Sequence, residues 1–214
     1  MQSDKAFFSI CSDLPECFSP NRIIFVPSVD IDEGGPVSII ALNAINGSKK
    51  WQYLSEDGFI KSLYATDTNL AFVGYQDFIS SLDIDTGKLL WRKDSGNWVS
   101  AISGFDNTIY YGSANTNVHA WDVSNGNSIW KYNIENGSFN YVLDAPIRIN
   151  DNIFFLSQRG ELFVLSANNG KPKIHKQTDI TAHVGLSTNG RWVVIGDSTG
   201  TVHAYDLSSL PYND

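Results

Sequence analysis

Short segments in which apolar and polar residues alternate recur along the whole chain, for example at residues 118–122 and 128–132. A period of two places successive side chains on opposite faces of an extended strand. Aromatic residues make up 13% of the chain, and aromatic side chains suit half-buried pleated surfaces. Because no long stretch has the three-to-four-residue spacing of an amphipathic helix, the pattern predicts an all-β fold.

One strand type recurs five times. It ends in Asn, Asp or Ser at positions 43, 83, 122, 166 and 206, so the steps are 40, 39, 44 and 40 residues. The first four copies continue into the same kind of turn, at Asn46-Gly47, Thr86-Gly87, Asn125-Gly126 and Asn169-Gly170. Gly tolerates the positive φ that a tight hairpin requires. Four residues after that Gly stand Trp51, Trp91 and Trp130, and in the fourth copy Ile174.

Four short strands every 40 residues or so are typical of one propeller blade. The last copy stops after its third strand, at residues 201–205, and residues 5–10 fall in register with the missing fourth strand. The sequence therefore predicts a five-bladed β-propeller of four-stranded antiparallel blades. It is closed by the N-terminal strand, which completes the last blade and leaves no unpaired edge there. Residues 1–214 would form a single domain.

The repeat resembles the PQQ-like repeat of quinoprotein dehydrogenases. The residues that carry the resemblance are Gly74, Asp77, Asp83, Gly87 and Trp91 in one copy and Gly112, Asn115, Asp122, Gly126 and Trp130 in the next. Similar repeats build the non-enzymatic propellers of outer-membrane barrel assembly, and the resemblance implies that the tryptophans dock one blade on the next.

A quinone enzyme of this family would need a larger, eight-bladed ring, a calcium ion and usually adjacent cysteines. The chain has five repeats, its cysteines are Cys11 and Cys17, and no set of calcium ligands can be mapped onto it. No nucleophile or metal motif is present either, and His119 and His203 stand at equivalent repeat positions, which is typical of a structural residue. We therefore expect no enzyme activity, no cofactor and no metal.

The charge balance limits the classes of partner that the chain is expected to bind. Asp and Glu total 23 against 15 Lys and Arg, a net charge of -8, which disfavours binding to nucleic acid. No segment approaches the ~18 apolar residues of a membrane span, and the N-terminus lacks the apolar centre of a signal peptide. The compartment stays open: cytoplasmic for the chain as it stands, or periplasmic or secreted if a leader was removed and Cys11 and Cys17 form a disulfide.

Propellers bind partners through the loops gathered on their faces. The candidate residues in those loops are aromatic, acidic or amide: Trp98, Asn97, Asp94, Asp57, Glu135, Asn136, Phe139 and Tyr141. The one long repeat interval, 44 residues, places the extra residues at 134–148. Because these loops differ from blade to blade, they favour a monomeric, non-catalytic module that binds one protein or peptide. The alternative is a lectin-like propeller for carbohydrate or another small ligand, and less favoured still are a glycoside-type hydrolase and a PQQ enzyme.

Overall fold

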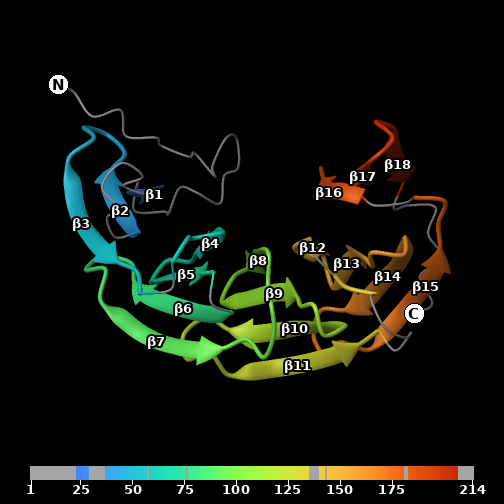
Figure 1. Cartoon of the computed structure of the whole chain (residues 1–214), viewed down its shortest axis with the longest axis horizontal. Helices are drawn as coiled ribbons and strands as arrows, with labels where there is room; N and C mark the ends of the chain where they lie inside the picture. Colours follow the sequence, from blue (N-terminus) through green and yellow to red (C-terminus); the bar gives the residue numbers. More distant parts are fainter. Residues whose placement is uncertain are drawn as a thin grey trace. The chain divides into compact units, whose positions relative to one another are not determined.

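Five antiparallel sheets follow one another along the chain in the computed structural model (Figure 1). The structure describes residues 23–28, 37–56, 58–75, 77–134, 140–142, 144–180 and 183–206. Every regular element within these ranges is a β-strand, which confirms the all-β prediction. The chain divides into two compact units, Met1–Gly96 with Val123–Gly126 and Asn97–Asp122 with Asn127–Asp214, and each is described by itself.

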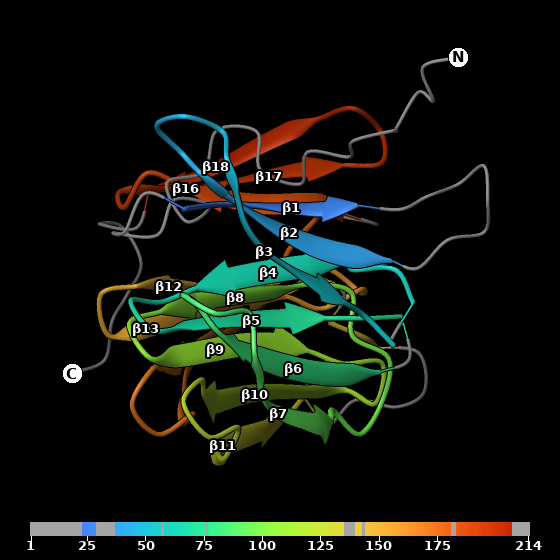
Figure 2. The ribbon, with the colours of Figure 1, turned by 90° about the vertical axis from the view of Figure 1, so that its left-hand side faces the viewer.

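Two sheets make up the first unit (Figure 2). The first has the order β1-β2-β3 and the second β4-β5-β6-β7. The strands are β1 (Ile23–Ser28), β2 (Ser38–Asn43), β3 (Lys49–Leu54), β4 (Ser62–Ala65), β5 (Asn69–Val73), β6 (Phe78–Asp83) and β7 (Leu89–Asp94). Consecutive strands pair as hairpins, so each sheet is a meander built from local contacts.

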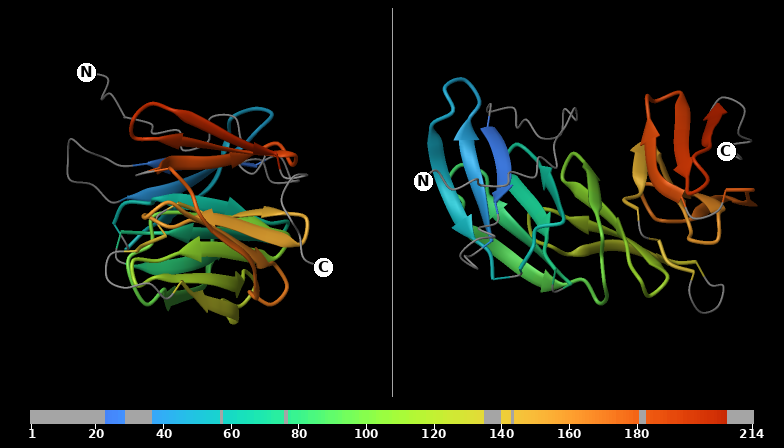
Figure 3. Two further views of the ribbon diagram at one scale, coloured as in Figure 1. Left: turned by 90° about the vertical axis from the view of Figure 1, so that its right-hand side faces the viewer. Right: turned by 45° about the horizontal axis from the view of Figure 1, so that its top comes forward.

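Three sheets make up the second unit (Figure 3). The first holds β8 (Ile102–Phe105), β9 (Thr108–Gly112), β10 (Asn117–Asp122) and β11 (Ser128–Asn133). The second holds β12 (Ile147–Ile149), β13 (Asn152–Leu156), β14 (Glu161–Ser166) and β15 (Pro172–Gln177). The third holds β16 (His183–Thr188), β17 (Trp192–Asp197) and β18 (Val202–Asp206). Each sheet is again a meander in chain order.

The five sheets coincide with the five sequence repeats. The recurrent strands predicted to end at positions 43, 83, 122, 166 and 206 are β2, β6, β10, β14 and β18, and each ends at that residue. The first strand of the third repeat, β8, begins at Ile102. The residues before it, Trp98 and Val99, belong to the connection that leads into the sheet. The closing strand predicted at residues 5–10 lies outside the described residues.

The three repeat tryptophans each bind a turn of the repeat that follows them in the sequence. The indole N–H of each donates to the backbone carbonyl of the first turn residue after the recurrent strand of the following sheet. The pairs are Trp51 with Ile84 (3.0 Å), Trp91 with Val123 (2.8 Å) and Trp130 with Ala167 (2.8 Å). The tryptophans are therefore packing residues, as the repeat implied.

The turn glycines are needed for the same contact. Gly87, Gly126 and Gly170 have φ of 70°, 66° and 67°, the left-handed region that other residues rarely adopt. A Cβ on these glycines would lie 2.6, 2.9 and 2.7 Å from the ring of the tryptophan that covers the turn. Glycine is therefore required at each position for two reasons: the turn needs a positive φ, and the indole ring leaves no room for a Cβ.

Apolar side chains fill the space between adjacent sheets within each unit. In the first unit, Phe25 and Trp51 pack with Leu70 and Phe72. In the second unit, Tyr110 and Trp130 pack with Ile153 and Phe163, and a further cluster includes Phe154, Val164 and Ile195. Packing of neighbouring blades face to face is how a repeat unit that cannot bury both faces alone becomes stable.

Deleting residues 1–10 tests the proposed closure of the last blade. We expect a lower melting temperature and association between chains, because an unpaired strand edge in that blade is a template for pairing with another molecule. Light scattering and thermal unfolding of the full and shortened chains give the answer. An unchanged melting temperature and an unchanged monomer would mean that residues 5–10 do not complete the blade.

Candidate functional site

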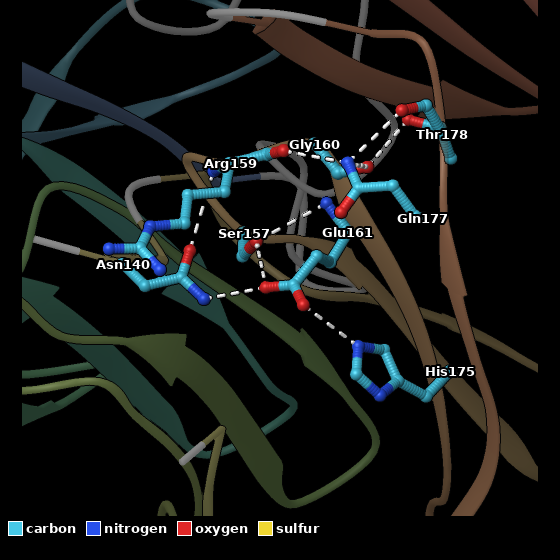
Figure 4. Close-up of polar contacts among 8 residues, drawn as sticks. All are labelled: Asn140, Ser157, Arg159, Gly160, Glu161, His175, Gln177 and Thr178. Carbon is cyan, nitrogen blue, oxygen red and sulfur yellow. Dashed lines mark hydrogen bonds and ion pairs between the residues drawn. The ribbon is translucent and has the colours of Figure 1, made fainter. Parts of the chain in front are cut away.

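The connection between β11 and β12 contains the residues that make the third repeat interval longest. Its residues 135–139 and 143 lie outside the described part of the chain, and the connection meets the fold at Asn140 and Tyr141. Asn140 is fully buried. Its side-chain Nδ2 donates to Glu161 Oε2 (2.6 Å) and its Oδ1 accepts from the backbone N–H of Arg159 (3.4 Å), as Figure 4 shows. The connection is therefore anchored on the β13–β14 turn.

Glu161, the first residue of β14, is the centre of this anchor. Ser157 Oγ donates to its Oε2 (3.1 Å), and His175 Nε2 on β15 lies 3.0 Å from its Oε1 (Figure 4). Because an ionised carboxylate can only accept, the imidazole is the donor. We call Asn140, Ser157, Glu161 and His175 the Glu161 cluster. Glu161 is only 8% exposed, so the cluster holds a nearly buried carboxylate with three side-chain donors.

The charge state of Glu161 follows from these contacts. Burial alone raises the pKa of its carboxyl group, but the hydrogen bonds from Asn140, His175 and Ser157 outweigh burial and leave the pKa below its ordinary value. Glu161 is therefore ionised at neutral pH. An ionised carboxylate makes stronger hydrogen bonds than a neutral one, which strengthens the attachment of Asn140.

The cluster is arranged for anchoring rather than for nucleophilic chemistry. In a catalytic triad the hydroxyl donates to the imidazole and the imidazole to the acid. Here Ser157 and His175 both donate to Glu161, one to each oxygen. A second anchor lies beside the cluster, where Gln177 Nε2 and Thr178 Oγ1 donate to the carbonyls of Arg159 (3.0 Å) and Gly160 (2.6 Å).

The predicted site residues divide between the units. Asp94 belongs to the first unit, and Asn97, Trp98 and Tyr141 belong to the second. Four others, Asp57, Glu135, Asn136 and Phe139, lie outside the described residues. Asp94 Oδ1 accepts from the backbone N–H of Gly96 (2.7 Å), and Asn97 Oδ1 accepts from that of Trp98 (2.9 Å).

Trp98 and Tyr141 occupy equivalent places in two successive sheets. The carbonyl of Trp98 accepts from the N–H of Ala114 (3.0 Å), and that of Tyr141 accepts from the N–H of Gln158 (2.8 Å). Each aromatic residue thus lies where the connection into its sheet meets the turn between the second and third strands. The Trp98 residue is 39% exposed, so it offers apolar surface to a partner as well as packing area.

The two equivalent histidines have different surroundings. His203 Nε2 lies 2.9 Å from Asp197 Oδ2. The ring of His119 stacks on Tyr111, with a 4.6 Å centroid distance, and meets Trp121 edge-on. Within the described ranges, no group of three or more His, Cys, Asp and Glu side chains is placed to hold a metal ion.

Sequence reasoning missed Asn140, Ser157 and Glu161. It also missed the contact between His175 and Glu161. The one sequence feature that pointed to this connection was the unusual length of the third repeat interval.

Comparison with known proteins places the repeat in a family. The family profile PQQ_2, described as outer membrane protein assembly factor BamB, matches residues 18–209. The chain belongs to this family. BamB of Pseudomonas aeruginosa is 26% identical over 184 residues, which cover 85% of this chain and 47% of that protein. BamB of Francisella salina is 28% identical over 65% of this chain and 27% of its own length. The chain thus spans half or less of the length of these BamB relatives.

Solved structures of other proteins have a fold similar to that of this chain. BamB from Moraxella catarrhalis aligns with a TM-score of 0.59 at 15% identity, covering 88% of this chain and 69% of that one. The computationally designed Ika8 protein aligns with a TM-score of 0.69 at 19% identity, covering 87% and 56%. Identities this low speak for the fold alone, and they support the propeller. No helix in the described part of the chain is long and apolar enough to cross a membrane.

Proposed function

We propose that the chain is a non-catalytic module that binds a protein partner during the assembly of outer membrane proteins. The observation that carries the proposal is the match of residues 18–209 to the family of outer membrane protein assembly factor BamB. The relatives of known name are assembly factors. We accordingly assign the chain to the cell envelope rather than to the cytoplasm.

The binding surface that we propose lies in the second unit. It consists of Trp98, Tyr141 and the β11–β12 connection. The two aromatic residues sit at equivalent connections, and aromatic side chains on a rigid support contribute strongly to protein interfaces. The Glu161 cluster supplies the rigid support, because Asn140 is buried next to Tyr141 and fixed by an ionised carboxylate.

Site-specific photo-cross-linking tests the proposal. A photoreactive amino acid at Trp98 or Tyr141 should form adducts in cells, and mass spectrometry should identify the adducts as outer membrane proteins or their assembly factors. Ile45, which is 72% exposed in a turn of the first unit, is the control position. Equal adducts from Ile45, or adducts only with unrelated proteins, would contradict the proposal. Glycan binding that is lost in Trp98→Ala would support the carbohydrate alternative instead.

The Glu161 cluster gives a prediction about the same surface. Asn140→Ala should leave the buried Glu161 carboxylate with one donor fewer, which costs about 1–3 kcal/mol in the free energy of unfolding. We also expect faster hydrogen exchange at the amides of Arg159 and Gln158, because their acceptors lie on the released connection.

Urea unfolding and amide exchange measure these two effects. Gln177→Ala is the matched control, since it removes a neighbouring anchor to Arg159 and Gly160 without touching Asn140. If both variants loosened the Gln158 amide equally, the connection would not be held by Glu161.

A further inference from the structure

Basic side chains are concentrated on the last strand of each of the first four sheets. We call β3, β7, β11 and β15 the outer strands; each is the terminal strand of its sheet. These strands and the residue just before each one hold nine of the basic residues: Lys49, Lys50, Lys88, Arg92, Lys93, Lys131, Lys171, Lys173 and Lys176. Asp94 is the one carboxylate that the same segments contain.

The remaining described residues have the opposite balance. Outside the outer strands, the described lysines and arginines are Lys61, Arg148, Arg159 and Arg191. Thirteen Asp and Glu residues accompany them in the same ranges. In a chain with a net charge of -8, the outer strands are therefore locally cationic. At physiological ionic strength charges beyond about 8 Å are screened, so distant acidic residues do not cancel this local charge.

Two basic residues on β7 have partners within the fold. Arg92 lies over the ring of Phe78 (3.5 Å), and Lys93 Nζ donates to the carbonyl of Gly126 (3.1 Å). By contrast, Lys131 and Lys176 are exposed and, among the described residues, no carboxylate lies within 4.0 Å of their amines. Their charge is directed to solvent or to a partner.

Exposed aliphatic side chains share the outer strands with the lysines. They are Leu54 on β3 (55% exposed), Leu89 and Leu90 on β7 (39% and 47%) and Ile129 on β11 (48%). Lysine at a sheet edge deters pairing with other strands. That purpose does not account for large exposed aliphatic residues beside the lysines, because such residues favour association.

We propose that the outer strands of the second unit, β11 and β15, bind the anionic headgroups of a phospholipid surface. Lysine with exposed aliphatic side chains is the combination that attracts a protein to an anionic membrane surface. Eight of the nine basic residues are Lys, which acts as a point charge towards phosphate, whereas Arg provides the fixed fork suited to a particular carboxylate or phosphate on a protein. The inference is independent of the protein partner proposed above.

Vesicle binding of the full chain tests this inference. The probes are phosphatidylcholine vesicles with and without phosphatidylglycerol, at low and high salt. The variant is Lys171→Gln with Lys173→Gln and Lys176→Gln, which lowers the charge of β15 by three. The matched control is Ser187→Glu with Ser198→Glu and Val202→Glu, which lowers the net charge by the same amount on exposed residues of the fifth sheet, where none of the outer strands lies.

We expect binding only to vesicles that contain phosphatidylglycerol, weakened by salt. Since each basic residue near such a surface is worth roughly five-fold in affinity, the β15 variant should bind at least ten-fold more weakly. The control should bind like the parent chain. No binding to phosphatidylglycerol vesicles, which would point to an acidic protein as the partner, overturns the inference. An equal loss of vesicle binding in the control would also overturn the inference. Aggregation of the β15 variant with unchanged vesicle binding would overturn it as well.

Discussion

Replacing Trp130 by alanine should lower the free energy of unfolding by about 3–5 kcal/mol. The side chain is 7% exposed and packs against Tyr110, with 6.0 Å between ring centroids. Truncation removes this contact, leaves a cavity above Gly170 and takes the hydrogen-bond donor from the carbonyl of Ala167. The loss is therefore larger than that of a hydrogen bond or of a single apolar contact.

Two further variants separate the parts of this contact. Trp130→Phe keeps a ring over Gly170 but loses the indole N–H, so we expect a loss of about 1–3 kcal/mol. Trp98→Ala is the exposed control and should cost less than about 1 kcal/mol. Urea unfolding of the three variants provides the comparison. A loss below about 1 kcal/mol in Trp130→Ala would mean that the sheets of the second unit are held together without the tryptophan.

The blade architecture could be predicted because its determinants are local and periodic. A turn such as Asn125-Gly126 specifies a hairpin from two neighbouring residues, and the repeated tryptophan marks the contact with the next blade. The sequence also shows where the pairing of a tryptophan with the next turn glycine stops. The fourth repeat has Ile174 at the tryptophan position, and the fifth has Leu210 where the others have the turn glycine. The tryptophan of the fourth repeat and the turn glycine of the fifth are thus both replaced in the sequence.

The Glu161 cluster could not be predicted in this way. Asn140 and Glu161 are 21 residues apart in the sequence. The strand position of Glu161 is filled by Phe78 in the second repeat and by Asn117 in the third, so the pattern gives no reason to expect a carboxylate. Loop position alone suggested Trp98 and Tyr141. It could not reveal which buried polar group anchors the connection.

Acid should destabilise the fold through His119. Its side chain is buried, and in the described residues Nε2 has no hydrogen-bond partner. Burial, assisted by the positive charge of Lys131 opposite, lowers the pKa of His119 from 6.5 to about 4. The unfolded chain therefore binds a proton more readily than the folded chain. The resulting stability is complete above pH 6.5 and is lost progressively as the pH falls towards 4.

His119→Phe should remove this pH dependence. The equivalent position in the next sheet is Phe163, which stacks on Phe155 as His119 stacks on Tyr111, so phenylalanine fits the repeat. Between about pH 7.5 and about pH 5, the parent chain should lose about 2 kcal/mol more unfolding free energy than the variant. Other titrating groups are common to both proteins and cancel in urea unfolding at the two pH values. Equal losses would show that His119 is protonated as readily in the fold as in water, and hence that water reaches its ring between Tyr111 and Trp121.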